Sequence, residues 1–127
     1  MIDHVSLSVS DMARSTRFYR AALEPLGYRC LTESSERAAF GKRYPELWLN
    51  ARPGMRPIEA ATGAHICLRA RTKSEIEAFH AGALAAGGTC DGPPGMRKAL
   101  MVDYFAAFVR DPDGNRIEAM TVPAAGA

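Results

Sequence analysis

The chain has 127 residues, of which 47% are hydrophobic and 24% are charged, a balance typical of one folded domain that excludes a disordered chain. The net charge of +2 is scattered without a basic stripe, so we expect no nucleic-acid partner. No apolar run is long enough to cross a bilayer, no secretory signal is visible, and the three cysteines form no close pair; we therefore expect a cytoplasmic protein with no membrane partner.

The first half of the chain predicts one strand, one helix and three further strands. Residues 2–9 alternate between apolar and polar side chains, which indicates a strand with one apolar face. Ser10 or Asp11 can cap the helix that follows, and Pro25 with Gly27 ends it. Short strands are then expected near 28–33, 36–41 and 46–50.

The second half predicts the same order of elements. Another alternating strand is followed by Thr72 and Glu75, which form a capping box for a helix that runs to about Ala86. Residues 92–98 indicate a loop ahead of the penultimate strand, and Asp-Pro-Asp-Gly-Asn at 111–115 predicts a hairpin turn. The strands themselves are expected near 88–90, 102–109 and 115–121.

The two halves are related by a shift of 61 positions, which brings His4 onto His65 and Gly27 onto Gly88. We therefore predict a single domain over 1–127 made of two βαβββ repeats, about 1–60 and 61–127. The fold class is α+β, with helices on one face of a cupped mixed sheet and a cleft on the other.

Polar side chains from both repeats predict a metal site in that cleft. His4 and His65 lie on the polar face of the first strand of each repeat. Glu46 and Glu118 alternate with apolar residues in the last strands, which places them on the cleft side. Imidazole and carboxylate groups bind divalent ions such as Zn, Ni, Mn, Fe or Co. The alternative for Glu46 is a solvated residue, because a slip of one residue would turn it outward.

Four parts of the sequence resemble the vicinal oxygen chelate superfamily, which contains glyoxalases, bleomycin-resistance proteins and extradiol dioxygenases. They are Ile-Asp-His-Val at 2–5, the predicted helix with Phe-Tyr at 18–19, Gly-Ala-His-Ile at 63–66 and Phe-Val-Arg-Asp-Pro-Asp-Gly-Asn-Arg-Ile-Glu at 108–118. The resemblance covers nearly the whole chain, and the stretch from 111 to 118 is its most specific part. It implies paired βαβββ modules around a divalent ion held by His4, His65 and Glu118, with Glu46 as a fourth ligand.

The resemblance also implies a function. We expect a divalent-metal-dependent, glyoxalase-like lyase or isomerase, or a related oxygenase, whose small substrate chelates the ion through adjacent oxygens. Glu46 and Glu118 are the candidate catalytic residues. The alternative is a non-catalytic binding protein of the antibiotic-resistance type that holds a small molecule in the same cleft. Retention of His4, His65 and Glu118 favours the enzyme.

Three further residues are candidate substrate contacts: Trp48 as a wall of the cleft, Tyr104 as a hydroxyl donor, and Arg97 as a partner for an anionic substrate. Their alternatives are core aromatic residues and a solvated basic loop. We also predict a homodimer, because each repeat leaves open sheet edges and two-fold dimers are the commonest oligomers. Pairing of the repeats within one chain or between two chains is left open.

Overall fold

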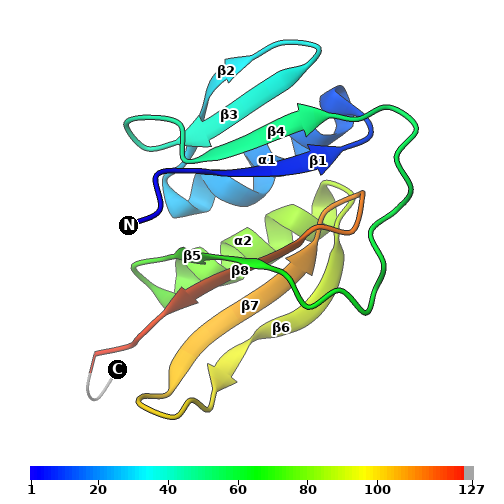
Figure 1. Ribbon diagram of the computed structural model, residues 1–127. Coiled ribbons are helices and arrows are strands. Elements are labelled where there is room, and N and C mark those ends of the chain that lie inside the picture. Colours follow the sequence, from blue (N-terminus) through cyan, green and yellow to red (C-terminus); the bar gives the residue numbers. More distant parts are fainter. Residues whose placement is uncertain (125–127) are drawn as a thin grey trace.

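The computed structural model describes residues 1–124 and contains two units with the same element order (Figure 1). The first unit consists of β1 (Val5–Val9), α1 (Met12–Leu23), a 3-10 turn (Glu24–Leu26), β2 (Arg29–Glu33), β3 (Arg37–Gly41) and β4 (Leu47–Ala51). The second consists of β5 (Ile66–Arg69), α2 (Lys73–Ala85), β6 (Thr89–Arg97), β7 (Tyr104–Arg110) and β8 (Arg116–Thr121). The predicted α+β class and the two βαβββ modules are confirmed.

Each unit has its own four-stranded mixed sheet. The strand orders are β1-β4-β3-β2 and β5-β8-β7-β6, so the first and last strands of each unit are neighbours. Those neighbours are parallel, whereas the remaining pairs are antiparallel. This topology brings the residues before β1 and β5 next to the strands that end their units, where the candidate ligands were predicted.

Local signals account for the helix boundaries. Asp11 is the N-cap of α1, and its carboxylate accepts a hydrogen bond from the amide of Arg14 at 3.0 Å. The hydroxyl of Thr72 caps α2 in the same way, accepting from the amide of Glu75. The first helix ends in a short 3-10 turn closed by Gly27, whose φ of 86° is accessible to glycine at little cost.

One predicted loop is a strand. The segment 92–98 is predicted as a loop ahead of the penultimate strand, but β6 continues to Arg97 and pairs with β7 across two irregularities in register. The prediction was wrong because prolines and glycines were taken as signs of a loop. Since β6 is an edge strand, Pro93 and Pro94 can lack an N–H donor without breaking a ladder on both sides.

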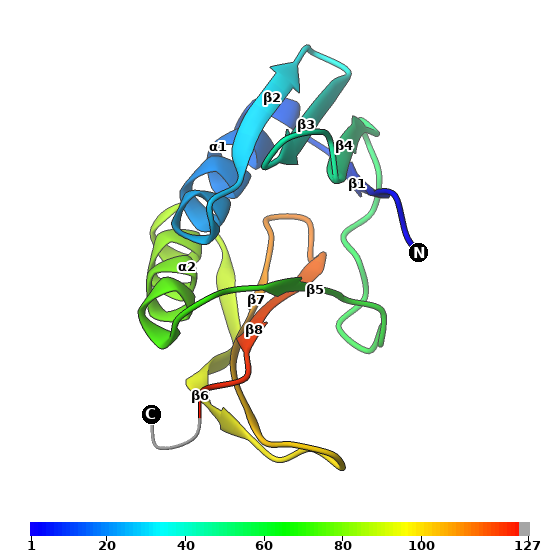
Figure 2. The same cartoon turned by 90° about the vertical axis from the view of Figure 1, so that its left-hand side faces the viewer.

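The helices pack side by side and join the two units through one hydrophobic core, on one side of the molecule in Figure 2. A Cβ atom added at Gly82 of α2 would lie 2.6 Å from the carbonyl oxygen of Ala21, so the two helices approach closely there. The largest fully buried side chains come from both units: Phe18, Tyr19, Phe40 and Phe79. Within residues 1–124 no helix combines the length and apolar character needed to span a membrane.

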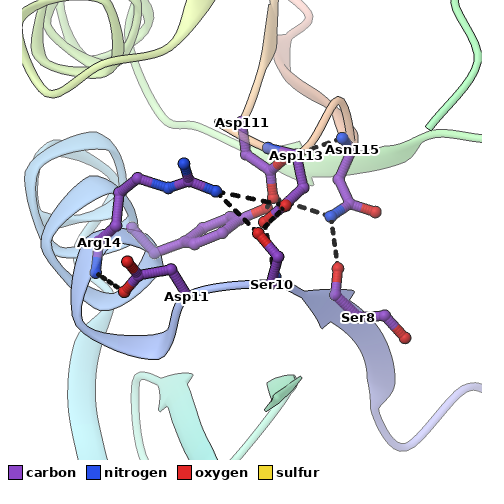
Figure 3. Close-up of polar contacts among 8 residues, drawn as sticks. Ser8, Ser10, Asp11, Arg14, Asp111, Asp113 and Asn115 are labelled. Carbon is purple, nitrogen blue, oxygen red and sulfur yellow. Dashed lines mark hydrogen bonds and ion pairs between the residues drawn. The ribbon is translucent and has the colours of Figure 1, made fainter. Parts of the chain in front are cut away.

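The predicted turn between β7 and β8 reaches into the first unit (Figure 3). Asp111 is only 3% exposed, and its carboxylate accepts a hydrogen bond from the hydroxyl of Tyr19 at 2.7 Å. The same carboxylate accepts from the backbone amides of Asp113 and Asn115, which closes the turn. Burial raises the pKa of Tyr19 well above its usual value, and the neighbouring Asp111 carboxylate raises it further.

Two more side chains of this turn bind the segment that joins β1 to α1. Asp113 is 5% exposed, and its carboxylate accepts hydrogen bonds from the amide and hydroxyl of Ser10. The guanidinium of Arg14 also lies 3.3 Å from it. Asn115 donates its side-chain amide to the carbonyl of Ser8 at 3.0 Å. These contacts fix the second unit against the first.

Replacing Tyr19 with Phe tests this contact. The variant leaves a buried carboxylate short of one donor, so we expect the free energy of unfolding to fall by about 1.5–3 kcal/mol at pH 7. Chemical denaturation measures it, with the exposed Tyr44→Phe as a control that should change stability by less than about 0.5 kcal/mol. Equal effects of the two variants would contradict the assignment.

Tyr19→Phe should also change how folding stability depends on pH in the alkaline range. Because the pKa of Tyr19 is higher in the folded chain than in the unfolded chain, only the unfolded chain loses this proton as the pH rises above about 10. Folding stability therefore falls with rising pH in that range. We expect a shallower fall in Tyr19→Phe, measured as unfolding free energy between pH 8 and pH 11.

Candidate functional site

The candidate site residues lie on the sheet faces opposite the helices. Val9 of β1 and Leu47 and Leu49 of β4 belong to the buried core. Since strand side chains alternate, Ser6 and Trp48 point to the other face. His4 comes directly before β1, and His65 comes directly before β5. The predicted polar face of each first strand is therefore present in both units.

His65 and Glu118 form a pair in the second unit. The Nε2 atom of His65 lies 3.0 Å from Oε1 of Glu118. The glutamate side chain is 6% exposed, whereas the imidazole is 41% exposed. The ring of Phe108, which is the register partner of Glu118 in β7, meets the imidazole edge-on with centroids 5.9 Å apart. Phe108 was not predicted as a site residue, although its alternation with Tyr104 places it on this face.

Cys67 is the register partner of Glu118 in β5. Desolvation raises the pKa of the Cys67 thiol to about 12, and the charge of Glu118 contributes to the shift. The group is therefore a neutral thiol at pH 7. As its register partner, Cys67 lies beside Glu118 on the same face of the sheet.

His4 occupies a separate pocket in the first unit. Ser6, Arg37, Trp48 and Asn50 line this pocket with it. The Nδ1 atom of His4 lies 2.8 Å from a carboxylate oxygen of Asp3. With that carboxylate as acceptor, the proton of a neutral imidazole resides on Nδ1, and Nε2 keeps its lone pair. Arg37 and Asn50 were not predicted, since no local motif marks them.

The strand registers show which residue of the first unit is equivalent to Glu118 of the second. In the first unit Val5 is opposite Leu47, and in the second Ile66 is opposite Ile117. Glu118 therefore corresponds to Trp48 and not to Glu46.

Glu46 lies just before β4, and its carboxylate accepts a weak hydrogen bond from the amide of Lys42 at 3.4 Å. Its charge also adds to the effect of burial in raising the pKa of Tyr28. Among residues 1–124, no three His, Cys, Asp or Glu side chains come close enough together to hold a metal ion. One chain thus brings together His65 and Glu118, but not the four predicted ligands.

The two other predicted substrate contacts lie on β6 and β7. Arg97 and Tyr104 are register partners at the end of these strands. Tyr104 precedes Phe108 by four residues on β7, which corresponds to roughly 13 Å along the strand. The guanidinium of Arg97 extends back over the Phe108 ring, 5.8 Å from its centroid, and donates to the carbonyl of Pro93.

Comparison with known proteins gives a consistent family. Residues 1–119 match the profile of the Glyoxalase/Bleomycin resistance protein/Dioxygenase superfamily. The chain is 30% identical over 119 residues to virulence protein STM3117 of Salmonella typhimurium, covering 92% of this chain and 81% of that protein. A glyoxalase/bleomycin resistance protein from Albidiferax ferrireducens has 31% identity and a TM-score of 0.81, covering 92% of this chain and 95% of its own. A glyoxalase-related enzyme from Fulvimarina pelagi, at 19% identity and a TM-score of 0.70, covers all of this chain and 95% of its own and shares the fold.

The His65–Glu118 pair has a measurable effect on stability. His65→Ala leaves a buried carboxylate without its partner, so we expect the free energy of unfolding to fall by about 1–3 kcal/mol. Replacing both residues with leucine should recover part of this loss, because no buried charge remains. In metal-free protein His4→Ala is the matched control, since that side chain is half exposed and its loss should cost less than about 0.5 kcal/mol. A double variant less stable than His65→Ala would contradict this account.

Proposed function

Because the chain belongs to the Glyoxalase/Bleomycin resistance protein/Dioxygenase superfamily, we propose that it is a divalent-metal-dependent enzyme that acts on a small molecule with adjacent oxygen atoms. The reaction class is a glyoxalase-like lyase or isomerase, or a related oxygenase. The observation that carries the proposal is the His65–Glu118 pair, which faces away from the helices in the second unit.

The geometry of this pair fits one ion. The imidazole nitrogen and the carboxylate oxygen lie close enough together for one ion to be held by both. The observed separation of Nε2 and Oε1 is 3.0 Å. Imidazole and carboxylate are also the donor types that divalent transition metals accept. When bound, such an ion supplies Lewis-acid polarisation to adjacent oxygens of a substrate.

We assign His4 as the third ligand. Its Asp3 contact matches the arrangement in which a metal-binding histidine donates one ring N–H to a carboxylate and binds through the other nitrogen. His4 and His65 also hold the same place before the first strand of their units. Two histidines and one carboxylate form a ligand set that leaves positions for substrate oxygens. Glu46 falls outside this set.

The proposed site is completed in a homodimer. Since one chain does not gather the three ligands, the second unit of one protomer would meet the first unit of its partner. A two-fold axis then generates two equivalent sites from one contact surface. Each site would combine His65 and Glu118 of one protomer with His4 of the partner subunit. This arrangement also supplies a neighbour for the sheet edge that ends at β1.

Metal titration tests the ligand set. In isothermal titration calorimetry with Zn²⁺ and Co²⁺, we expect about one ion per chain in the metal-free protein. His4→Ala, His65→Ala and Glu118→Ala should each weaken binding by about 100-fold or more, because even residues that only orient a ligand contribute 10–100-fold. His80→Gln is the control, since His80 lies on α2 and contacts Cys90.

Glu46→Gln distinguishes a set of three ligands from a set of four that includes Glu46. Unchanged affinity supports three ligands, whereas a loss equal to that of Glu118→Ala would require a fourth and contradict our assignment. A protein that binds no metal would overturn the proposal. Metal binding without turnover of a hemithioacetal, an epoxide with a thiol, or a catechol would favour the non-catalytic binding protein instead.

Complementation tests the shared site. At a metal concentration that just fills the wild-type sites, His4→Ala and Glu118→Ala should each bind little metal alone. Co-expressed chains form mixed dimers with one intact site and one doubly altered site. Half of randomly paired protomers are in such dimers, so about a quarter of all sites should recover metal binding. Recovery near zero, with dimers confirmed by light scattering, would show that all ligands come from one chain.

A further inference from the structure

The pocket around His4 in the first unit has an unusual lining. Its side chains are those of His4, Ser6, Arg37, Trp48 and Asn50. All five carry an N–H or O–H donor, and none is a carboxylate. Arg37 is the only permanently charged member of this lining. A pocket with these groups is complementary to an oxyanion.

The sheet register explains why these residues share one face. Arg37 of β3 is opposite Asn50 of β4, which is opposite Ser8 of β1. Ala38 and Phe40, the neighbours of Ala39, belong to the core, so Arg37 and Ala39 face away from the helix. The guanidinium and the side-chain amide are therefore neighbours on adjacent strands.

Trp48 lines the pocket and has a small residue next to it on each neighbouring strand. Ala39 is the register partner of Trp48 in β3, and Ser6 is its partner in β1. Both neighbours have small side chains, and Trp48 itself is only partly buried. The pocket volume of about 180 Å³ lies below the roughly 300–1,000 Å³ of complete small-molecule sites, so it suits one part of a ligand.

The charge of Arg37 is not neutralised by the protein. Arg20 pairs with Glu33 and Arg116 pairs with Asp91, but among residues 1–124 the guanidinium of Arg37 has no carboxylate within 4.0 Å. Guanidinium groups bind carboxylates and phosphates through two parallel hydrogen bonds. A ligand that brings such a group would meet an unpaired donor next to Asn50.

We infer that Arg37 and Asn50 form an oxyanion subsite beside the metal ligand His4, and that the substrate carries a carboxylate or phosphoryl group in addition to its adjacent oxygens. This inference rests on the proposed function, since it places the substrate next to His4. The chelating oxygens would bind at the metal, Trp48 would contact the portion between them, and Arg37 would hold the anionic end. Arg37 is then a specificity-determining residue.

The single tryptophan of the chain reports directly on this pocket. We would titrate metal-free protein with benzoate and with inorganic phosphate and follow the fluorescence of Trp48. At least one probe should change the emission, and Arg37→Gln should weaken its binding by about tenfold or more. Arg29→Gln, an exposed arginine on β2 of the same unit, is the matched control and should bind like the wild type.

The two probes distinguish the two sources of oxyanion. A response to benzoate alone identifies a carboxylate on a planar group, and a response to phosphate alone identifies a phosphoryl group. If neither probe alters the emission while circular dichroism shows a folded protein, the inference is overturned. Equal affinities of the wild type and Arg37→Gln would also overturn it.

A second pair of probes separates this inference from the proposed function. In metal-loaded protein, calorimetry compares catechol with 3,4-dihydroxybenzoate, which has the same adjacent oxygens and a carboxylate. The carboxylate should increase affinity by about tenfold, and Arg37→Gln should abolish the gain. If the protein binds metal and catechol but the carboxylate brings no gain in affinity, the oxyanion subsite is refuted and the proposed function stands. Failure to bind metal, with benzoate or phosphate still dependent on Arg37, would refute the function and leave the subsite standing.

Discussion

Two buried carboxylates in the turn between β7 and β8 determine how the two units are placed. Asp111 and Asp113 belong to the second unit, but Tyr19 and Ser10 of the first unit supply donors to them. Separating the units would exchange these hydrogen bonds for contacts with water, at a net cost of about 1.5–3 kcal/mol for each bond to a charged group. The turn therefore does more than reverse the chain, because it holds the units in one orientation with their helices in contact.

That orientation has a direct consequence for the site. Since α1 and α2 share one core, the inner face of each sheet is covered, and the candidate ligands remain on the opposite faces. The His65–Glu118 pair and the pocket of His4 then belong to different units and are not joined in one chain. With the units in this orientation, we propose that a second copy of the chain completes the metal site.

Much of this arrangement could be predicted from local sequence, and the remainder depends on tertiary contacts. Alternation located the strands, and the caps at Asp11 and Thr72 located the helices, because these signals act within a few residues. The turn at 111–115 was predicted, but its side-chain partners about a hundred residues away were not. The correspondence of Glu118 with Trp48 was missed for a similar reason. Register depends on how the strands pair within each sheet, and spacing along the chain does not define it.

The two units share one backbone plan but differ in charge at equivalent places. Glu118 provides a buried carboxylate in the second unit, whereas its equivalent in the first is the uncharged Trp48. The pocket around that tryptophan contains Arg37 and no acidic residue. A site built from two copies of the same unit would hold two carboxylates and repel an anionic substrate. Because the proposed site combines unlike units, one carboxylate helps to hold the ion, and the opposing face stays positive enough to bind an oxyanion. The difference between Glu118 and its equivalent Trp48 thus gives the proposed cleft one acidic side and one basic side.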